Sequence, residues 1–141
     1  MLFWGQWHTS KDMCAVLIAI FSGYGLLGLA TSLGARFLDK FEKVVDYQAT
    51  FRTLDLVWAA VGIAIHQYLM VTQESFADIQ NSSNNVLKVW YHFFCWGGWL
   101  KLHKLGIRMG NFELQMDCLC AFAPLFPSAG KNNYAKSAAH H

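Results

Sequence analysis

Residues 13–35 read MCAVLIAIFSGYGLLGLATSLGA and include no charged side chain. This stretch of about 23 residues exceeds the roughly 20 that an α-helix needs to cross the hydrocarbon core of a bilayer. Because no water reaches the backbone there, a segment of this kind crosses a membrane as a helix. The sequence therefore predicts an all-α membrane protein, whose other segments fold against lipid.

The composition of the 141-residue chain points the same way. Hydrophobic residues make up 55% of it and charged residues only 14%, whereas soluble proteins average about 25% charged residues. Three spanning helices and their connections would use most of this length, which leaves little for a soluble catalytic domain. The formal net charge of +2 is small and the basic residues are scattered, so we exclude nucleic acid as a partner.

Three stretches are predicted to span the membrane. We place the first span at 13–38, the second at 54–71 (LDLVWAAVGIAIHQYLMV) and a weaker third at 86–105. Lys88 and Lys101 flank the apolar part of the third stretch, and long lysine side chains can reach the interface from within a short span. A helix lying on the membrane surface is the alternative for this third stretch.

The remaining segments are expected at the membrane surface. Residues 39–53 predict an amphipathic interfacial helix, because their apolar side chains recur at helical spacing. Residues 112–127 are too short to cross and contain Pro124 and Pro127, so we expect them to re-enter or to lie on the interface. The polar tail, 128–141, should run along a neighbouring protein or into water.

Basic residues are distributed unequally over this layout. With three crossings, nine of the 11 Lys and Arg residues fall on one side, and only Lys11 and Lys88 fall on the other. Because basic residues concentrate on the side where the protein is synthesised, the count favours three spans with the C-terminus on the cytosol, matrix or stroma side.

Small residues in the first span are candidates for helix packing. Ala15, Ala19 and Gly23 recur every four residues, and Gly28 and Ser32 repeat the spacing. Small side chains four apart form a groove in which the backbone of another helix can lie. The alternative is that Gly and Ala are simply frequent in membrane helices.

Two histidines are candidates for cofactor binding. An ionisable side chain within a span is costly and commonly functional, which singles out His66. His92, early in the third span, would lie at a similar depth, and two histidines from different helices can ligate one haem iron. Chlorophyll is a further possibility. The reading that we favour is an interfacial histidine bonded to a carbonyl or a headgroup, in a chain that binds lipids and no other cofactor.

No catalytic site is predicted. Cys118 and Cys120 lack the second pair, or the spaced histidines, of a zinc site, so we predict no metal. The run SGYGLLG lies in an apolar segment with no preceding strand, which argues against a phosphate-binding loop. No nucleophile with a spaced base is found either, so we expect the chain not to be an enzyme.

The three spans, with Val45, Asp46 and Tyr47 after the first, resemble the anchor subunits of succinate dehydrogenase. This resemblance implies haem and quinone held between helices, although no histidine stands about ten residues before the tripeptide. The residues themselves favour a non-catalytic accessory subunit of a large respiratory complex in the mitochondrial inner membrane, with other membrane subunits and lipids as partners. A haem-, quinone- or pigment-binding anchor is the alternative function, and a thylakoid or other organelle membrane is the alternative location.

Overall fold

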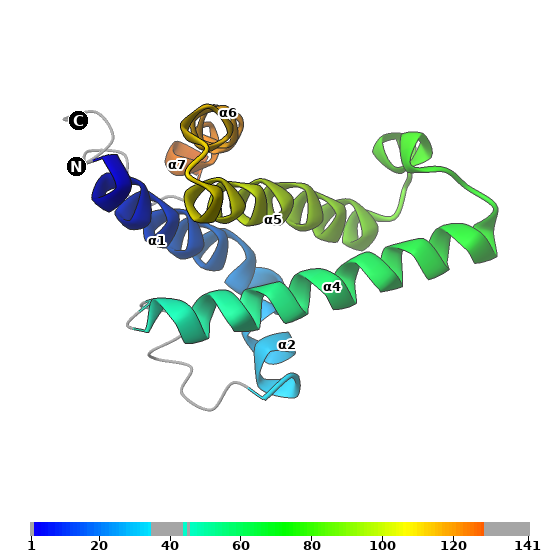
Figure 1. Cartoon of the computed structure of the whole chain (residues 1–141). Coiled ribbons are helices and arrows are strands. Elements are labelled where there is room, and N and C mark those ends of the chain that lie inside the picture. Colours follow the sequence, from blue (N-terminus) through cyan, green and yellow to red (C-terminus); the bar gives the residue numbers. More distant parts are fainter. Residues whose placement is uncertain (1, 35–43, 45, 129–141) are drawn as a thin grey trace.

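The computed structural model describes residues 2–34, 44 and 46–128 of the chain. All secondary structure in these ranges is helical (Figure 1), which confirms the predicted all-α class. The elements are α1 (Leu2–Phe21), the 3-10 helix η1 (Ser22–Tyr24), α2 (Leu26–Ser32), α4 (Tyr47–Thr72), the 3-10 helix η2 (Phe76–Asn81), α5 (Asn85–Met109), α6 (Phe112–Phe122) and α7 (Leu125–Ser128).

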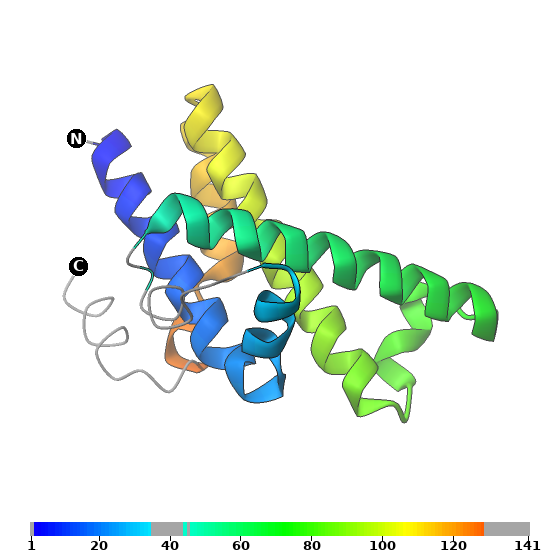
Figure 2. The same cartoon turned by 90° about the horizontal axis from the view of Figure 1, so that it is seen from below.

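Helix α5 is central to the arrangement. It lies between α4 and α6 and beside α1 (Figure 1), and it contacts all three of these helices. Seen from below, α4 crosses α5 at an open angle and does not run alongside it (Figure 2). Contacts between the two helices extend from Phe51 of α4, beside Lys104, to Gly62, beside Phe94.

The first predicted span is not one continuous helix. α1 ends at Phe21, a single 3-10 turn follows, and α2 leaves in a direction bent by 98°. Gly25 makes the bend, because it adopts φ 100° and its N–H donates to the carbonyl oxygen of Ser22, a conformation that L side chains rarely adopt. This finding corrects the prediction of one helix over 13–38, of which 35–38 lie outside the described residues.

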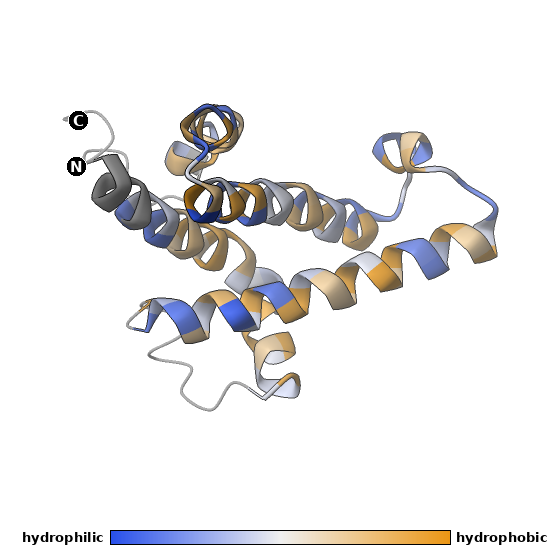
Figure 3. Ribbon diagram, in the orientation of Figure 1, coloured by the Kyte–Doolittle hydropathy of each residue, from blue (hydrophilic) through white to orange (hydrophobic). Residues whose placement is uncertain are grey.

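One described helix, α4, is long and apolar enough to cross a membrane. An 18-residue window within its 26 residues has a mean hydropathy of 1.5, and apolar residues recur along the helix in Figure 3. Only 33% of that window is buried. The bent pair formed by His8–Tyr24 and Leu26–Ser32 passes the same test as a unit, so up to two spans are present by length and composition. Three spans are not confirmed, because α5, which contains the third predicted stretch, carries lysines and weakly apolar Trp and Tyr side chains.

The predicted interfacial helix over 39–53 is not a separate element in its described part. Residues 47–53 are the first turns of α4 and continue into the second predicted span, and Asp46 caps this helix by accepting a hydrogen bond from the backbone N–H of Ala49 at 3.2 Å. Residues 39–43 and 45 lie outside the described residues, as does the tail after residue 128. Residues 112–127 form α6 and most of α7, and α6 packs on α5, where the amide of Gln115 donates to the carbonyl oxygen of Gly106 at 3.0 Å.

The crossing of α4 and α5 depends on two glycines and two aromatic rings. A Cβ atom at Gly62 would lie 2.6 Å from Phe94, and one at Gly97 would lie 2.7 Å from Trp58. The two rings stack with centroids 4.6 Å apart and planes 9° apart. The indole N–H of Trp58 donates to the carbonyl oxygen of Phe94 at 2.8 Å. Each ring therefore occupies the space that a side chain would need on the opposite helix.

Helix α1 completes the core. Leu17 and Phe21 are buried in the same cluster as Phe93 of α5, and the ring of Phe21 meets that of Phe93 edge-on with centroids 5.3 Å apart. The buried hydroxyl groups of Ser10 and Tyr47 share a hydrogen bond of 2.6 Å. This bond joins α1 to the first turn of α4 and satisfies two polar groups that would be costly to bury alone.

The close approach at Gly97 gives a direct test of this packing. We expect Gly97→Ala to lower the melting temperature, because overpacking costs about 1–3 kcal/mol and exceeds the roughly 1 kcal/mol that Ala gains over Gly within a helix. Gly98→Ala is the control, since its Cβ would meet nothing closer than 3.9 Å. It should leave the melting temperature unchanged or raise it. Thermal unfolding followed by circular dichroism in detergent measures both, and equal effects would contradict the close approach.

Candidate functional site

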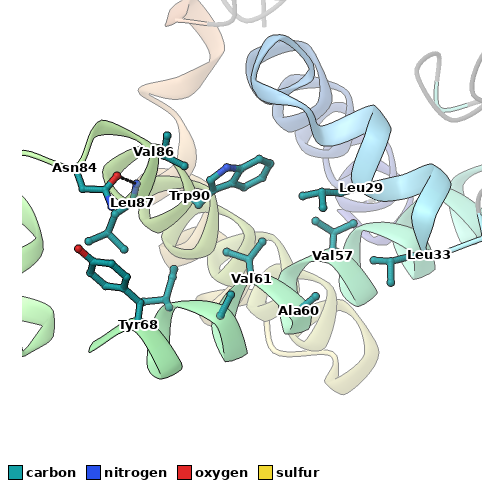
Figure 4. Close-up of a pocket in the computed structure, with 12 residues that line it drawn as sticks. Leu29, Leu33, Val57, Ala60, Val61, Tyr68, Asn84, Val86, Leu87 and Trp90 are labelled. Atoms are coloured by element: carbon teal, nitrogen blue, oxygen red, sulfur yellow. Dashed lines mark hydrogen bonds between the residues drawn. The ribbon is translucent and has the colours of Figure 1, made fainter. Parts of the chain in front are cut away.

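An apolar groove lies between α2, α4 and the start of α5 (Figure 4). Its volume is about 340 Å³, within the range of pockets that bind small molecules. The residues that line it are Leu29 and Leu33 of α2, Val57, Ala60, Val61, Ala64, Ile65 and Tyr68 of α4, and Asn84, Val86, Leu87 and Trp90 at the start of α5.

The groove exists because of the bend at Gly25. The turn brings α2 back against α4, where Leu26 and Ala30 are buried, while Leu29 and Leu33 stay exposed and form one wall. On α4, Ala60 and Ala64 lie four residues apart, so they share a face of the helix. Their methyl groups leave space that larger side chains would fill.

Polar side chains occur at one end of the groove. Figure 4 shows Tyr68 and Asn84 at the end away from Leu33. The side-chain oxygen of Asn84 accepts a hydrogen bond from the backbone N–H of Leu87 at 3.1 Å and so caps α5. None of the residues lining the groove is charged. The groove can therefore bind an uncharged, elongated apolar group, with hydrogen bonding available at one end.

A second surface of α4 is open and apolar. Leu56, Ile63 and Met70 recur every seven residues, which places them on one face of the helix, and they are 50%, 60% and 78% exposed. Val57 and Val61, which line the groove, lie roughly a third of a turn from this row, and Ala60 lies at the border between the two faces. Helix α4 thus has one face on α5, one in the groove and one uncovered. An apolar row of this kind indicates contact with a membrane or with another protein.

The candidate cofactor ligands lie outside the groove. His66 and His92 are both exposed, and neither lines it. The ring of His66 meets Phe76 of η2 edge-on with centroids 5.0 Å apart, and Phe76 in turn contacts Tyr91, the neighbour of His92. Among the residues that the structure describes, no group of three His, Cys, Asp or Glu side chains could hold a metal ion. The hypothesis of haem between the two histidines stays untested.

The turn that holds Phe76 against His66 is closed by a reciprocal cap. Asp78 accepts hydrogen bonds from the backbone N–H of Ser75 at 2.7 Å and from its hydroxyl at 3.0 Å. These bonds hold the pKa of Asp78 below its ordinary value of 3.8. A lowered pKa means that the stabilisation is present above the unfolded value and is lost as the pH falls through the folded one. The cap is therefore complete at neutral pH.

The small residues predicted to pack are used unequally within the chain. Ala15 and Ala19 are partly buried. A Cβ at Gly23 or Gly28 would meet nothing within 4 Å, and Ser32 is exposed, with its hydroxyl bonded to the carbonyl oxygen of Gly28 at 3.1 Å. The predicted groove for another helix would thus have to be filled by a second protein, and it stays a prediction.

The sequence indicates only part of the site. Ala60 and Ala64, which line the groove, have the four-residue spacing of a close-packing helix face. Gly62 and Gly97, which set the crossing of α4 on α5, have no regular spacing. Only the bulky Trp96 and Trp99 around the second glycine would have drawn attention to it. Comparison of the chain with protein-family models, with curated proteins and with solved structures found no match.

Proposed function

We propose that this chain is a non-catalytic subunit of a multisubunit membrane complex, in which α4 crosses the bilayer and the groove receives an apolar helix of a neighbouring subunit. One observation on α4 carries the proposal. Its 18-residue apolar window has a mean hydropathy of 1.5, as in helices that cross membranes, yet the rest of the chain buries only 33% of that window. A helix of this composition needs lipid or protein around its open faces.

The groove has the properties of a seat for a helix. It is open to the surface between α2 and α4, and Ala60 and Ala64 form its floor at the four-residue spacing that lets helix backbones approach closely. Leu29 and Leu33 on one side and Trp90 on the other can pack against the flanks of an incoming helix. The absence of charge along this lining suits an apolar helix better than an amphipathic one.

We place this complex in the mitochondrial inner membrane and propose an accessory role in a respiratory assembly, with lipids bound around α4. The support comes from the sequence, which has 16% aromatic residues and little chain outside its apolar segments. It also comes from the uncovered Gly23 and Gly28, which offer a second contact site to a partner helix.

The second candidate function is a haem-, quinone- or pigment-binding anchor, like those of succinate dehydrogenase. The observation that favours it is the groove volume of about 340 Å³ together with Tyr68 and Asn84 at one end, an arrangement typical of sites for a long apolar molecule with a polar head. A quinone fits this arrangement better than a haem ligated by histidine, because neither His66 nor His92 lines the groove.

Filling the groove tests the first proposal. The tagged chain, purified from its native membrane in mild detergent, should migrate with other subunits on a native gel. Ala64→Phe should reduce the recovery of those subunits about fivefold or more, since a large side chain at a packed contact costs about 1–3 kcal/mol. Ala59→Phe is the matched control, because Ala59 is exposed on the same helix and does not line the groove. A chain that migrates alone, or two variants with equal effects, would contradict the proposal.

The histidine tests the second candidate. We expect His66→Leu to leave the visible absorption of the purified protein or complex unchanged. The substitution should lower the free energy of unfolding by at most about 1.5 kcal/mol, because it removes the ring contact of His66 with Phe76 and Leu can keep an apolar contact there. Absorption spectra and thermal unfolding measure the two effects. A visible band that both His66→Leu and His92→Leu abolish would instead show a haem held by this pair.

A further inference from the structure

Basic side chains gather where the start of α4 meets the end of α5. Lys101, Lys104 and Arg108 lie three and four residues apart along α5, so they share one face of it. Arg52 lies in the second turn of α4, and its charge and that of Arg108 both act on Lys104. Figure 3 shows hydrophilic bands on both the first turns of α4 and the last turns of α5, at the same end of the molecule.

Aromatic rings position the two lysines of this cluster. The Nζ atom of Lys101 lies 3.9 Å from the ring centroid of Trp58, and the Nζ atom of Lys104 lies 3.7 Å from that of Phe51. Cations over aromatic faces are attracted to them, so the ammonium groups are held in place before any ligand binds. Both rings belong to α4, which fixes the two lysines relative to Arg52.

Positive charge exceeds negative charge in the cluster. Asp55 bonds to Lys101, with 2.6 Å between Oδ1 and Nζ, and its charge also reaches Lys104. Among the described residues, Asp55 is the acidic side chain that acts on these lysines, and the cluster has four cations. Arg52 and Arg108 are exposed, and the side chain of Lys101 is 35% exposed, so an incoming anion can reach the cluster. Arginine and lysine donors at close range are a binding arrangement for phosphate.

The position of the cluster along α4 selects the source of that phosphate. A helix of 26 residues is about 39 Å long, whereas the hydrocarbon core is about 30 Å thick. The first turns of α4, which are its most polar, then extend to the headgroup level. Trp58 lies one and a half turns from Arg52 and Trp99 is exposed nearby on α5, and tryptophan favours this level of the membrane.

We propose that Arg52, Lys101, Lys104 and Arg108 form a binding site for the phosphate of an anionic lipid headgroup. The inference rests on the proposed function in one respect, namely that α4 crosses a bilayer. Basic clusters directly beside a spanning helix attract anionic lipids. A bound headgroup would offset the mutual repulsion of Lys104, Arg52 and Arg108 and would fix the depth of α4 in the bilayer.

The test compares lipids on the full chain in a neutral detergent. Native mass spectrometry measures the retention of phosphatidylglycerol and of phosphatidylcholine, and inorganic phosphate is titrated as a competitor. The wild-type chain should retain phosphatidylglycerol in clear preference to phosphatidylcholine. Arg52→Gln with Arg108→Gln should weaken the retention of phosphatidylglycerol by roughly 30-fold, at about fivefold for each cation.

Two further variants serve as controls. Lys88→Gln removes a cation from the first turn of α5, at the opposite end of this helix from the cluster, and should keep the wild-type affinity. Arg52→Lys with Arg108→Lys preserves the charge and should stay within about threefold of wild type, which separates lost charge from a disturbed fold. Thermal unfolding of each variant confirms that it is folded.

Three results would overturn the inference. Equal retention of the two lipids would show that the cluster does not recognise the negative charge of the headgroup. An acidic segment of a partner protein would then be the candidate ligand of the cluster. Full competition by inorganic phosphate at the same concentration as the lipid would assign the site to free phosphate. Wild-type affinity in the Arg→Gln pair would place the lipid elsewhere. If one of these three results is obtained and partner subunits still co-purify with the chain, the lipid site is wrong and the proposed function stands. If the chain selects anionic lipid but purifies without partner subunits, the proposed function is wrong and the lipid site stands.

Discussion

The reciprocal contact between α4 and α5 is the constraint on which the other features depend. Phe94 occupies the space above Gly62, and Trp58 occupies the space above Gly97. The two contacts are coupled, because the rings stack on one another and the indole N–H bonds to the backbone of Phe94. In an apolar surrounding an unpaired indole N–H would be costly, so this hydrogen bond selects one position of the Trp58 ring. The crossing point is thereby fixed along both helices at once.

The crossing with α5 buries one face of α4 along its length, and the bend at Gly25 brings α2 over part of what remains. Helix α2 reaches α4 beside the crossing and buries Leu26 and Ala30, but its other side chains stop short of α5. The groove is the space that remains between these three helices. Two local geometries, a close helix crossing and a left-handed glycine, are thus sufficient to produce an apolar surface that no other described part of the chain fills.

The sequence predicts the helices of this protein better than their contacts. Residues 54–71 and 86–105 lie within α4 and α5, because hydropathy and helical spacing are local properties. The bend at Gly25 escaped prediction, since glycine is common in apolar helices and does not change the average hydropathy. Regular spacing drew attention to Gly23, yet the glycines that pack within the described chain are irregularly placed, at 62, 97 and 106. Their importance comes from the side chains opposite them, which is non-local information. For the same reason the groove, which joins three distant segments, has no local signature beyond the spacing of Ala60 and Ala64.

The charged end of α4 and the apolar groove are related through the depth of the helix in a bilayer. Lys101 and Lys104 lie over aromatic rings of α4, so their stems follow apolar surface while their ammonium groups remain at the edge. If this edge lies at the headgroup level, Ala60 and Ala64 lie about two to three turns deeper, within the hydrocarbon. At that depth no water competes for the surface of the groove, and association depends on close packing and on matching polar groups. The small side chains of Ala60 and Ala64 and the uncharged lining of the groove allow such close packing. The polar Tyr68 and Asn84 lie toward the opposite end of α4, where the helix again approaches an interface. The charges at one end thus determine which kind of partner the groove can meet.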